Sequence, residues 1–297
     1  MKKTTVLDGK KFSLKMIRRI SESISQIKSK YSFIPGLATI VVGEDPASLV
    51  YVKNKRKKAA EVGINSEEYR LSKREGEKTL LNLINKLNED SDIDGILLQL
   101  PVPSYIETRS ALDLILAEKD VDGFHTTNSG LLSSGRPNVI PCTPLGCLLL
   151  IREYFQTLDG KNVMIIGRSN IVGRPMANLL INHNATVTVS HSKSKNIPKL
   201  CKESDIIIAA VGKPKMVKSS WIKKGACVID VGINRIYDEK GNGSLVGDVD
   251  YEEAKEVAGA ITPVPGGVGP MTIACLLNNV AKLACERRGV AVPDKII

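Results

Sequence analysis

Short apolar runs alternate with longer amphipathic segments along most of this chain, and that alternation constrains its fold more than any other feature. Buried parallel strands appear in sequence as short runs rich in Val, Ile and Leu, and crossover helices carry an apolar stripe at helical spacing. Strands are expected at residues 37–42, 65–71, 94–100, 163–166, 186–189, 206–209 and 226–230. Helices are expected at residues 14–27, 47–62, 79–87, 145–155 and 271–288. The pattern predicts an α/β fold.

Several local signals mark where these elements begin and end. Ser13 is the expected N-cap of the first helix, and Gly63 is expected to close the second. A hairpin is expected from Asn234 to Asp248, with its turn at Lys240-Gly-Asn-Gly243. The stretch 123–144 is rich in Gly, Pro, Ser, Thr and Asn, so it is the expected domain boundary. A chain of 297 residues is long enough for two domains.

Composition excludes several classes of protein. No apolar run approaches the roughly 20 residues that cross a membrane, and no signal-peptide core follows Met1. The six cysteines are scattered without a CxxC pair and the histidines are not clustered, which argues against a disulfide scaffold and a metal site. The net charge of +10 suits anionic partners, but aromatic residues make up only 4% and no nucleic-acid-binding motif is present. We therefore expect a cytoplasmic protein that binds neither nucleic acid nor membrane.

A glycine turn after the strand at 163–166 is the first candidate site. The strand continues directly into Gly167-Arg-Ser-Asn-Ile-Val-Gly-Arg-Pro175, at the start of an expected helix. Glycines let the backbone approach a pyrophosphate, and a helix N-terminus attracts its charge. The spacing differs from GxGxxG, so an ordinary strand–helix turn is an equally good interpretation of this turn alone.

The end of the next strand bears on which dinucleotide would bind. NAD-binding units commonly place an acid there for the ribose 2′-hydroxyl, whereas this strand runs into His191-Ser-Lys-Ser-Lys195. A 2′-phosphate suits this basic stretch, and Arg168 could reach the same place, so NADP is preferred to NAD. An exposed polar loop is the alternative for Lys193 and Lys195.

A lysine in the helix at 47–62 is the second candidate site. Helical spacing puts Ser48, Tyr51, Lys55, Ala59 and Val62 on one inward face, while the neighbouring basic residues point elsewhere. Burial favours the neutral form of a lysine, which can then exchange protons near neutral pH. A structural lysine whose ammonium reaches solvent is the alternative interpretation.

Three other positions resemble ligand-binding groups. Gln99 lies near the carboxyl end of an apolar run, where α/β sheets gather such groups, and Lys55 or a ligand could pair with its amide. Asp122 lies in a turn that can present a carboxylate, although such turns are common. The Pro/Gly-rich loop at 262–270 is either the lining of a cleft or a linker.

Together these segments resemble the methylenetetrahydrofolate dehydrogenase/methenyltetrahydrofolate cyclohydrolase family over nearly the whole chain. The matching motifs occur in order: Ser48-x-x-Tyr51-x-x-x-Lys55, Gly95-Ile-Leu-Leu-Gln-Leu-Pro101, Lys119-Asp-Val-Asp-Gly-Phe124, Pro141-Cys-Thr-Pro144, Gly167 to Pro175, Asp230-Val-Gly-Ile-Asn234, Gly247-Asp-Val249 and Thr262 to Thr272. One departure is Thr126, where relatives often have a proline after the histidine.

The resemblance implies roles for particular residues. Lys55 would be the catalytic lysine, Tyr51 would position the folate, Gln99 would tune the lysine, and Asp122 would hold the pterin ring. The implied NADP-binding residues are Gly167, Arg168, Ser169, Ser192 and Ile233. The loop from Pro263 through Gly266 and Gly267 would line the folate side of a cleft.

The resemblance also implies an architecture and an activity. It implies a folate-binding catalytic domain at 1–144, a Rossmann NADP domain at 145–271 and a C-terminal helix at 272–297 that returns to the first domain, with a cleft between the domains. The implied enzyme is a homodimer of one-carbon metabolism, serving purine and amino-acid biosynthesis. It would oxidise 5,10-methylenetetrahydrofolate with NADP+ and hydrolyse the methenyl product to 10-formyltetrahydrofolate. A single-activity dehydrogenase of this or another Rossmann family, and a basic nucleic-acid-binding protein, are the alternatives.

Overall fold

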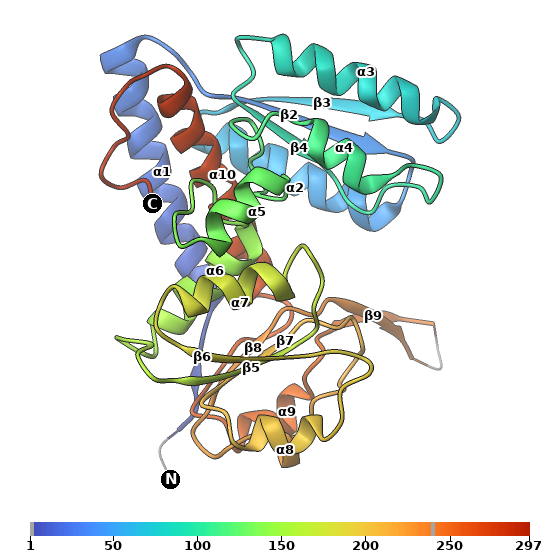
Figure 1. Ribbon diagram of the computed structural model, residues 1–297, viewed down its shortest axis with the longest axis vertical. Coiled ribbons are helices and arrows are strands. Elements are labelled where there is room, and N and C mark those ends of the chain that lie inside the picture. Colours follow the sequence, from blue (N-terminus) through green and yellow to red (C-terminus); the bar gives the residue numbers. More distant parts are fainter. Residues whose placement is uncertain (1–2, 239–240) are drawn as a thin grey trace. The chain divides into compact units, whose positions relative to one another are not determined.

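The computed structural model describes residues 3–238 and 241–297, which form two compact units. One unit comprises residues 14–131, 137–142 and 273–297, and the other comprises residues 1–13, 132–136 and 143–272 among those described. Figure 1 shows the elements of each unit. The predicted α/β class is confirmed in both units, because each has a parallel sheet covered by helices.

The first unit is built on a three-stranded parallel sheet of order β3-β2-β4. Its strands are β2 (Gly36–Val42), β3 (Asn65–Leu71) and β4 (Gly95–Leu98). Its helices are α1 (Gly9–Tyr31) from residue 14, α2 (Pro46–Val62), α3 (Gly76–Glu89), α4 (Thr108–Leu114), most of α5 (Thr126–Ser133), and α10 (Val268–Arg287) from residue 273. Helices α3 and α4 lie on one side of the sheet and α2 on the other (Figure 1).

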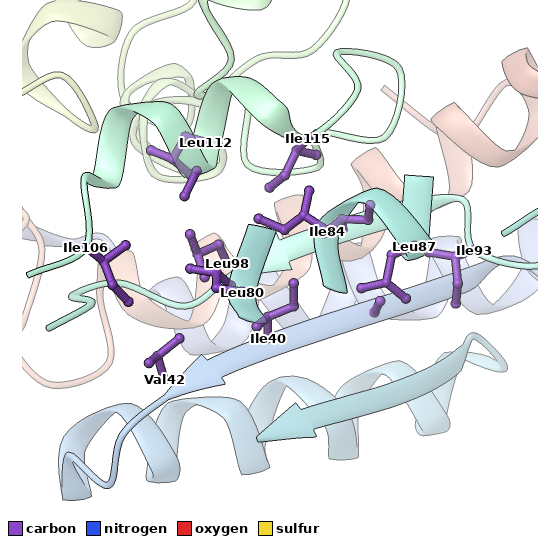
Figure 2. Close-up of a cluster of buried hydrophobic side chains, with 13 residues drawn as sticks. Ile40, Val42, Leu80, Ile84, Leu87, Ile93, Leu98, Ile106, Leu112 and Ile115 are labelled. Carbon is purple, nitrogen blue, oxygen red and sulfur yellow. The ribbon is translucent and has the colours of Figure 1, made fainter. Parts of the chain in front are cut away.

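The core of this unit fills the space between the sheet and helices α3 and α4 (Figure 2). Ile40 of β2 and Leu98 of β4 point toward Leu80 and Ile84 of α3, and all four side chains are buried. Every residue of β2 is buried, as expected of a central parallel strand with both faces covered. The sheet is thus a rigid support for side chains at its carboxyl edge.

The second unit is built on a six-stranded parallel sheet of order β1-β11-β8-β7-β5-β6. The strands are β1 (Thr5–Val6), β5 (Asn162–Ile166), β6 (Thr186–Ser190), β7 (Ile206–Ala209), β8 (Cys227–Asp230) and β11 (Ala260–Ile261). Helices α6 (Cys142–Arg152) and α7 (Gly173–Ile181) lie on one face, and α8 (Ile197–Lys202) and α9 (Tyr251–Lys255) on the other (Figure 1). A single 3-10 turn, η1 (Ser219–Trp221), precedes β8.

The strand order reverses direction at β5, which has β6 on one side and β7 on the other. In open α/β sheets such a switch point is where ligands bind, outside the carboxyl ends of the strands. The expected hairpin is also present, as β9 (Asn234–Tyr237) paired with β10 (Gly243–Val246). Lys240, the first residue of its predicted turn, lies outside the described residues.

The start of the first helix differs from the prediction. Helix α1 begins at Gly9, and its N-terminus is capped by Asp8, whose Oδ1 accepts a hydrogen bond from the Lys11 backbone at 2.9 Å. Ser13 is buried within the helix and donates to the Lys10 carbonyl, so its prediction as the N-cap was wrong. The polar first turn had no apolar spacing by which the sequence could reveal it.

The N-terminal segment forms a strand that the sequence did not reveal. Strand β1 pairs in parallel with β11, and residues 3–13 belong to the unit with the six-stranded sheet. A two-residue strand is too short to show periodicity.

The chain passes from one unit to the other within the stretch 123–144, which was the expected domain boundary. This stretch also contains α5, whose first turn is held by Asp113: its Oδ1 accepts from the Thr126 backbone at 2.9 Å. Helix α10 is long and apolar enough to cross a membrane by length and composition, although Thr272, Asn278, Asn279 and Lys282 interrupt its apolar residues. Because 72% of that stretch is buried within the protein, burial in a core explains its composition.

Candidate active site and cofactor site

Helix α2 carries Lys55 on its inward face, as its spacing predicts. Lys55 is only 7% exposed, and Ser48, Ala59 and Val62 on the same face are also buried. Lys57 lies two residues further along, about 200° round the helix from Lys55, and is exposed. The N-terminus of this helix is fixed by Asp45, whose Oδ2 accepts hydrogen bonds from the backbone and hydroxyl of Ser48 at 2.8 Å each. The buried lysine therefore lies on a well-anchored helix.

Gln99 is the direct partner of Lys55. The lysine Nζ donates to Oε1 of Gln99 at 3.0 Å. The amide is held in this orientation because its Nε2 donates to the Leu100 carbonyl at 2.7 Å. The Gln99 backbone donates to the Ile40 carbonyl of β2 at 2.9 Å, which continues the sheet ladder by one residue. The predicted pairing of the two side chains is thus present.

Asp122 completes the polar cluster in this unit. Burial raises the pKa of this half-buried carboxyl to about 6, the positive charge of Lys55 opposes the rise, and the charge of Asp120 adds to it. Asp120 itself holds the turn, since its carboxylate accepts hydrogen bonds from the backbones of Gly123 and His125 and from Nδ2 of Asn128. A carboxylate with a pKa near 6 is ionised at neutral pH and can accept hydrogen bonds from a ligand.

Tyr51 lies one turn before Lys55 on the same helix face and is half-buried. Burial raises the pKa of its hydroxyl, so Tyr51 is a neutral phenol at neutral pH. A neutral phenol presents both an apolar ring and a hydroxyl beside the lysine.

Asn279 of α10 is a part of this cluster that the sequence analysis missed. Its Nδ2 donates to the carbonyls of Val121 and Ile140, at 2.9 and 3.0 Å, and contacts Sγ of Cys142 at 3.6 Å. Asn279 therefore fixes the backbone on which Asp122 is carried. The available signal was the pair of asparagines at 278–279 in an otherwise apolar helix, because buried amides require partners.

The second cluster forms where β5 turns into α7. Gly167 has a φ of 117°, and a Cβ there would lie 2.2 Å from the Ala210 carbonyl oxygen, so a glycine is required. A Cβ on Gly173 would lie 2.1 Å from the Gly167 carbonyl oxygen. Between them, Oγ of Ser169 accepts hydrogen bonds from the backbones of Val172 and Gly173. At this turn two backbone segments pack closely together beside a helix N-terminus, as phosphate binding requires.

The other candidate cofactor residues lie along the same sheet. Arg168 and Ser192 each lie two residues beyond the end of their strand, β5 and β6, and the register pairs Ile166 with Ser190. Both side chains are exposed, as are Lys193 and Lys195. Ile233 follows β8 and is 48% exposed, an unusual exposure for an isoleucine. These side chains therefore share the carboxyl edge of the six-stranded sheet, where a dinucleotide would bind.

The Pro/Gly loop before α10 belongs to the same unit as the six-stranded sheet. The Gly266 carbonyl accepts a hydrogen bond from the Lys10 backbone at 3.0 Å. A Cβ on Gly267 would lie 2.5 Å from the Pro263 carbonyl oxygen, so the loop folds tightly on itself. Lys55, Gln99 and Asp122 lie in one unit, and the candidate cofactor residues lie in the other with this loop.

All six cysteines are buried. Within the described parts of the chain, no group of three or more His, Cys, Asp or Glu side chains is placed to hold a metal ion.

Comparisons with known proteins match both units. The family model for the tetrahydrofolate dehydrogenase/cyclohydrolase catalytic domain matches residues 7–122, and the model for the NAD(P)-binding domain of that family matches residues 141–288.

Full-length relatives and solved structures agree with these matches. The chain is 51% identical to bifunctional protein FolD 2 of Roseobacter denitrificans, with 97% of each chain covered, and 50% identical to FolD of Rhodospirillum centenum over the whole of both. The crystal structure of FolD from Campylobacter jejuni is 47% identical with a TM-score of 0.91, covering 96% of this chain and 99% of that one. The Trypanosoma brucei enzyme, described as complexed with NADP cofactor and inhibitor, is 37% identical with a TM-score of 0.93, covering 98% and 100%.

Proposed function

Since the chain belongs to the tetrahydrofolate dehydrogenase/cyclohydrolase family, we propose that Lys55 is the proton-transferring residue of its hydrolytic reaction. The protein is a bifunctional enzyme of one-carbon folate metabolism. It oxidises 5,10-methylenetetrahydrofolate with NADP+ to the methenyl compound and hydrolyses that compound to 10-formyltetrahydrofolate. The single-activity dehydrogenase and the nucleic-acid-binding protein that the sequence left open are disfavoured by these bifunctional relatives.

The 3.0 Å hydrogen bond between Lys55 and Gln99 is the observation that carries the proposal. Hydrolysis adds water to the cationic methenyl carbon, so the water must lose a proton before the ring opens. When the bond from that carbon to N5 breaks, N5 must gain a proton. A buried amine that accepts the first proton from water and donates it to N5 serves both steps, while the remaining hydroxyl proton is released to solvent as the formyl C=O forms. The oriented amide of Gln99 holds the amine nitrogen in place.

Substrate binding requires groups that recognise the pterin ring. We propose that the Asp122 carboxylate accepts hydrogen bonds from the N–H groups of the ring, which an ionised carboxylate can do at neutral pH. The ring of Tyr51, on the same helix face as Lys55, would pack against the folate. Pro263, Gly266 and Gly267 are proposed to line the substrate, by resemblance to the family.

The residues at the carboxyl edge of the six-stranded sheet fit NADP, because Gly167 and Gly173 allow a tight backbone turn beside the N-terminus of α7, where a pyrophosphate is stabilised. NADP+ supplies the hydride acceptor of the first reaction. We propose that Gly167 and Ser169 bind the pyrophosphate through the turn, and that Ile233 contacts the cofactor. Arg168 and Ser192 would bind the 2′-phosphate, which the absence of an acid at the end of β6 supports.

The domain division and the assembly are also proposals. We propose residues 1–144, 145–271 and 272–297 as the functional segments, with residues 1–13 contributing the first strand of the cofactor sheet. A cytoplasmic homodimer that serves purine and amino-acid biosynthesis is proposed from the family. Strand β6 ends the sheet, and Val189 within it is 36% exposed, as a surface for a second copy would be. A protein that sediments as a monomer at micromolar concentration would contradict the dimer.

Two rates measured on one variant test the role of Lys55. Lys55→Met retains the aliphatic stem but removes the ammonium, so the cyclohydrolase rate should fall by about 10²–10⁴-fold. The dehydrogenase rate should remain measurable, because hydride transfer requires orientation and no proton donor. Lys57→Met is the matched control, since Lys57 is an exposed lysine on the same helix. If Lys55→Met hydrolyses methenyltetrahydrofolate at the parental rate, Lys55 is a structural lysine.

A further inference from the structure

Asp248 is a fully buried carboxylate that none of the reactions above uses. It follows the hairpin strand β10, and its side chain accepts hydrogen bonds from three consecutive backbone N–H groups. Oδ2 accepts from Val211 at 2.6 Å and from Gly212 at 3.0 Å, and Oδ1 accepts from Lys213 at 2.8 Å. Oδ1 also accepts from Nδ2 of Asn234 at 2.9 Å. One side chain therefore organises a loop that lies 35 residues before it in the sequence.

Asp248 is held in place by a second buried carboxylate, Asp230, at the end of β8. Oδ1 of Asp230 accepts from the backbones of Gly232 and Asp248, at 3.0 and 2.9 Å, and Oδ2 accepts from Val249 at 2.9 Å. The backbone of Asp230 donates to Oγ1 of Thr262 at 2.8 Å. The two aspartates thus link the turn after β8, the end of the hairpin and the loop after β7.

Glycines make room for these two carboxylates. A Cβ on Gly232 would lie 2.3 Å from Cγ of Asp248, and a Cβ on Gly247 would lie 1.8 Å from Oδ2 of Asp230. No other residue type fits at either position without moving a carboxylate. The arrangement is therefore specific to carboxylates at 230 and 248 with glycines beside them.

The loop that Asp248 holds lies at the switch point of the sheet. It follows β7, the neighbour of β5, and the Ala210 backbone donates to the Ile166 carbonyl at 2.9 Å. The Ala210 carbonyl oxygen is the atom that a Cβ on Gly167 would approach to 2.2 Å. Residues 211–213 and the turn at Gly167 are thus adjacent where a dinucleotide binds in folds of this kind.

We propose that Asp248 is a positioning residue for NADP, which acts by fixing residues 211–213 beside the Gly167 turn. Without its acceptor, three neighbouring N–H groups would have no common partner, and the loop would adopt other conformations. The loop would then have to be ordered when the cofactor binds, so affinity for the cofactor would fall. The folate site described above has none of its proposed polar residues on this loop.

The test is Asp248→Asn, which keeps the volume but replaces one acceptor oxygen by an amide that faces N–H donors. The KM for NADP+ and its Kd from titration should rise by about tenfold or more. The cyclohydrolase rate, measured without NADP+, should change by less than about twofold. Asp250→Asn is the matched control, because Asp250 lies two residues away and its carboxylate pairs with Lys218 at 2.8 Å. That control should bind NADP+ as the parent does.

Two other outcomes would overturn the proposal. One is a KM for NADP+ that is unchanged in Asp248→Asn. The other is a lowered Tm with an equal loss of both activities, which is the result expected if Asp248 only stabilises the fold. If this variant does not fold, Asn234→Ala removes only the Asn234 hydrogen bond to Asp248 and should weaken NADP+ binding in the same direction. Amide hydrogen exchange on the parent gives an independent readout, because residues 211–213 must be protected before NADP+ is added. Rapid exchange there would also refute the proposal.

Discussion

Asp94 should stabilise the unit that carries Lys55 without taking part in its chemistry. It is fully buried just before β4, at the opposite end of that strand from Gln99. Its Oδ2 accepts from the Gly36 backbone at 2.9 Å, and its Oδ1 accepts from Nη1 of Arg287 at 3.0 Å and from Arg288. One carboxylate thus joins the start of β2, the start of β4 and the end of α10.

Asp94→Asn removes the charge and leaves the volume nearly unchanged. Breaking a buried ion pair by removing one partner costs about 3–5 kcal/mol. The two arginine side chains are 19% and 25% exposed, so water can partly solvate them once the carboxylate is gone. We therefore expect the lower end, a loss of about 3 kcal/mol in the free energy of unfolding. For a domain of this size that corresponds to a Tm lowered by about 6–12 °C.

Thermal unfolding followed by circular dichroism measures this change, and both enzyme rates should be measured well below the lowered Tm. The rates should stay near parental values, because the residues proposed for chemistry lie at the other end of the strand. Asp92→Asn is the control, since Asp92 is exposed two residues away. A Tm within about 2 °C of the parent would mean that this buried carboxylate contributes little net stability.

Two other predictions concern binding. Because the pKa of Asp122 is raised to about 6, its carboxylate is ionised above that pH and protonated below it, so the KM for folate should rise as the pH falls through 6. Asp122→Asn should remove that dependence, and a parental KM that stays constant across this range would exclude a direct contact with the pterin. Arg168→Ala should weaken NADP+ binding by about ten- to a hundredfold and NAD+ binding much less. Equal weakening of both cofactors would show that Arg168 does not bind the 2′-phosphate.

Much of the fold could be predicted because local patterns and tertiary burial agree in this chain. The run at 37–42 is apolar on both faces, and the structure buries it between helices on both sides of a parallel sheet. Helical spacing placed Lys55 on the inward face of α2, and its 7% exposure confirms that placement. Lys55 was one of the two partners expected for the buried amide of Gln99, and the hydrogen bond between them is present. In each case the feature depends on periodicity or on the partner that a buried polar group requires.

The features that were missed depend on residues far apart in the sequence. Strand β1 is recognisable only by its pairing with β11, about 250 residues later, because two residues show no period. Asn279 contacts Val121 across 158 positions, and no local signal specifies which carbonyl a buried amide will meet. The N-cap at Asp8 was missed because the first turn of α1 is polar and the apolar stripe begins later. Periodicity is local information, whereas these contacts are set by the tertiary fold.

The aspartates of this chain illustrate how environment separates structural carboxylates from those available to a ligand. Asp120 and Asp122 lie two residues apart in one turn, and burial raises the pKa of both. Asp120 already accepts hydrogen bonds from two backbone N–H groups and an amide, much as Asp248 accepts from three N–H groups and an amide. A carboxylate offers about four acceptor positions, so these two are largely occupied by the protein itself. Asp122 is half-buried beside Lys55 and accepts a side-chain hydrogen bond from the Cys142 thiol, so most of its acceptor positions are the ones that a substrate can use. Counting the donors around each carboxylate therefore distinguishes Asp122 from its neighbour, which the sequence motif alone cannot do.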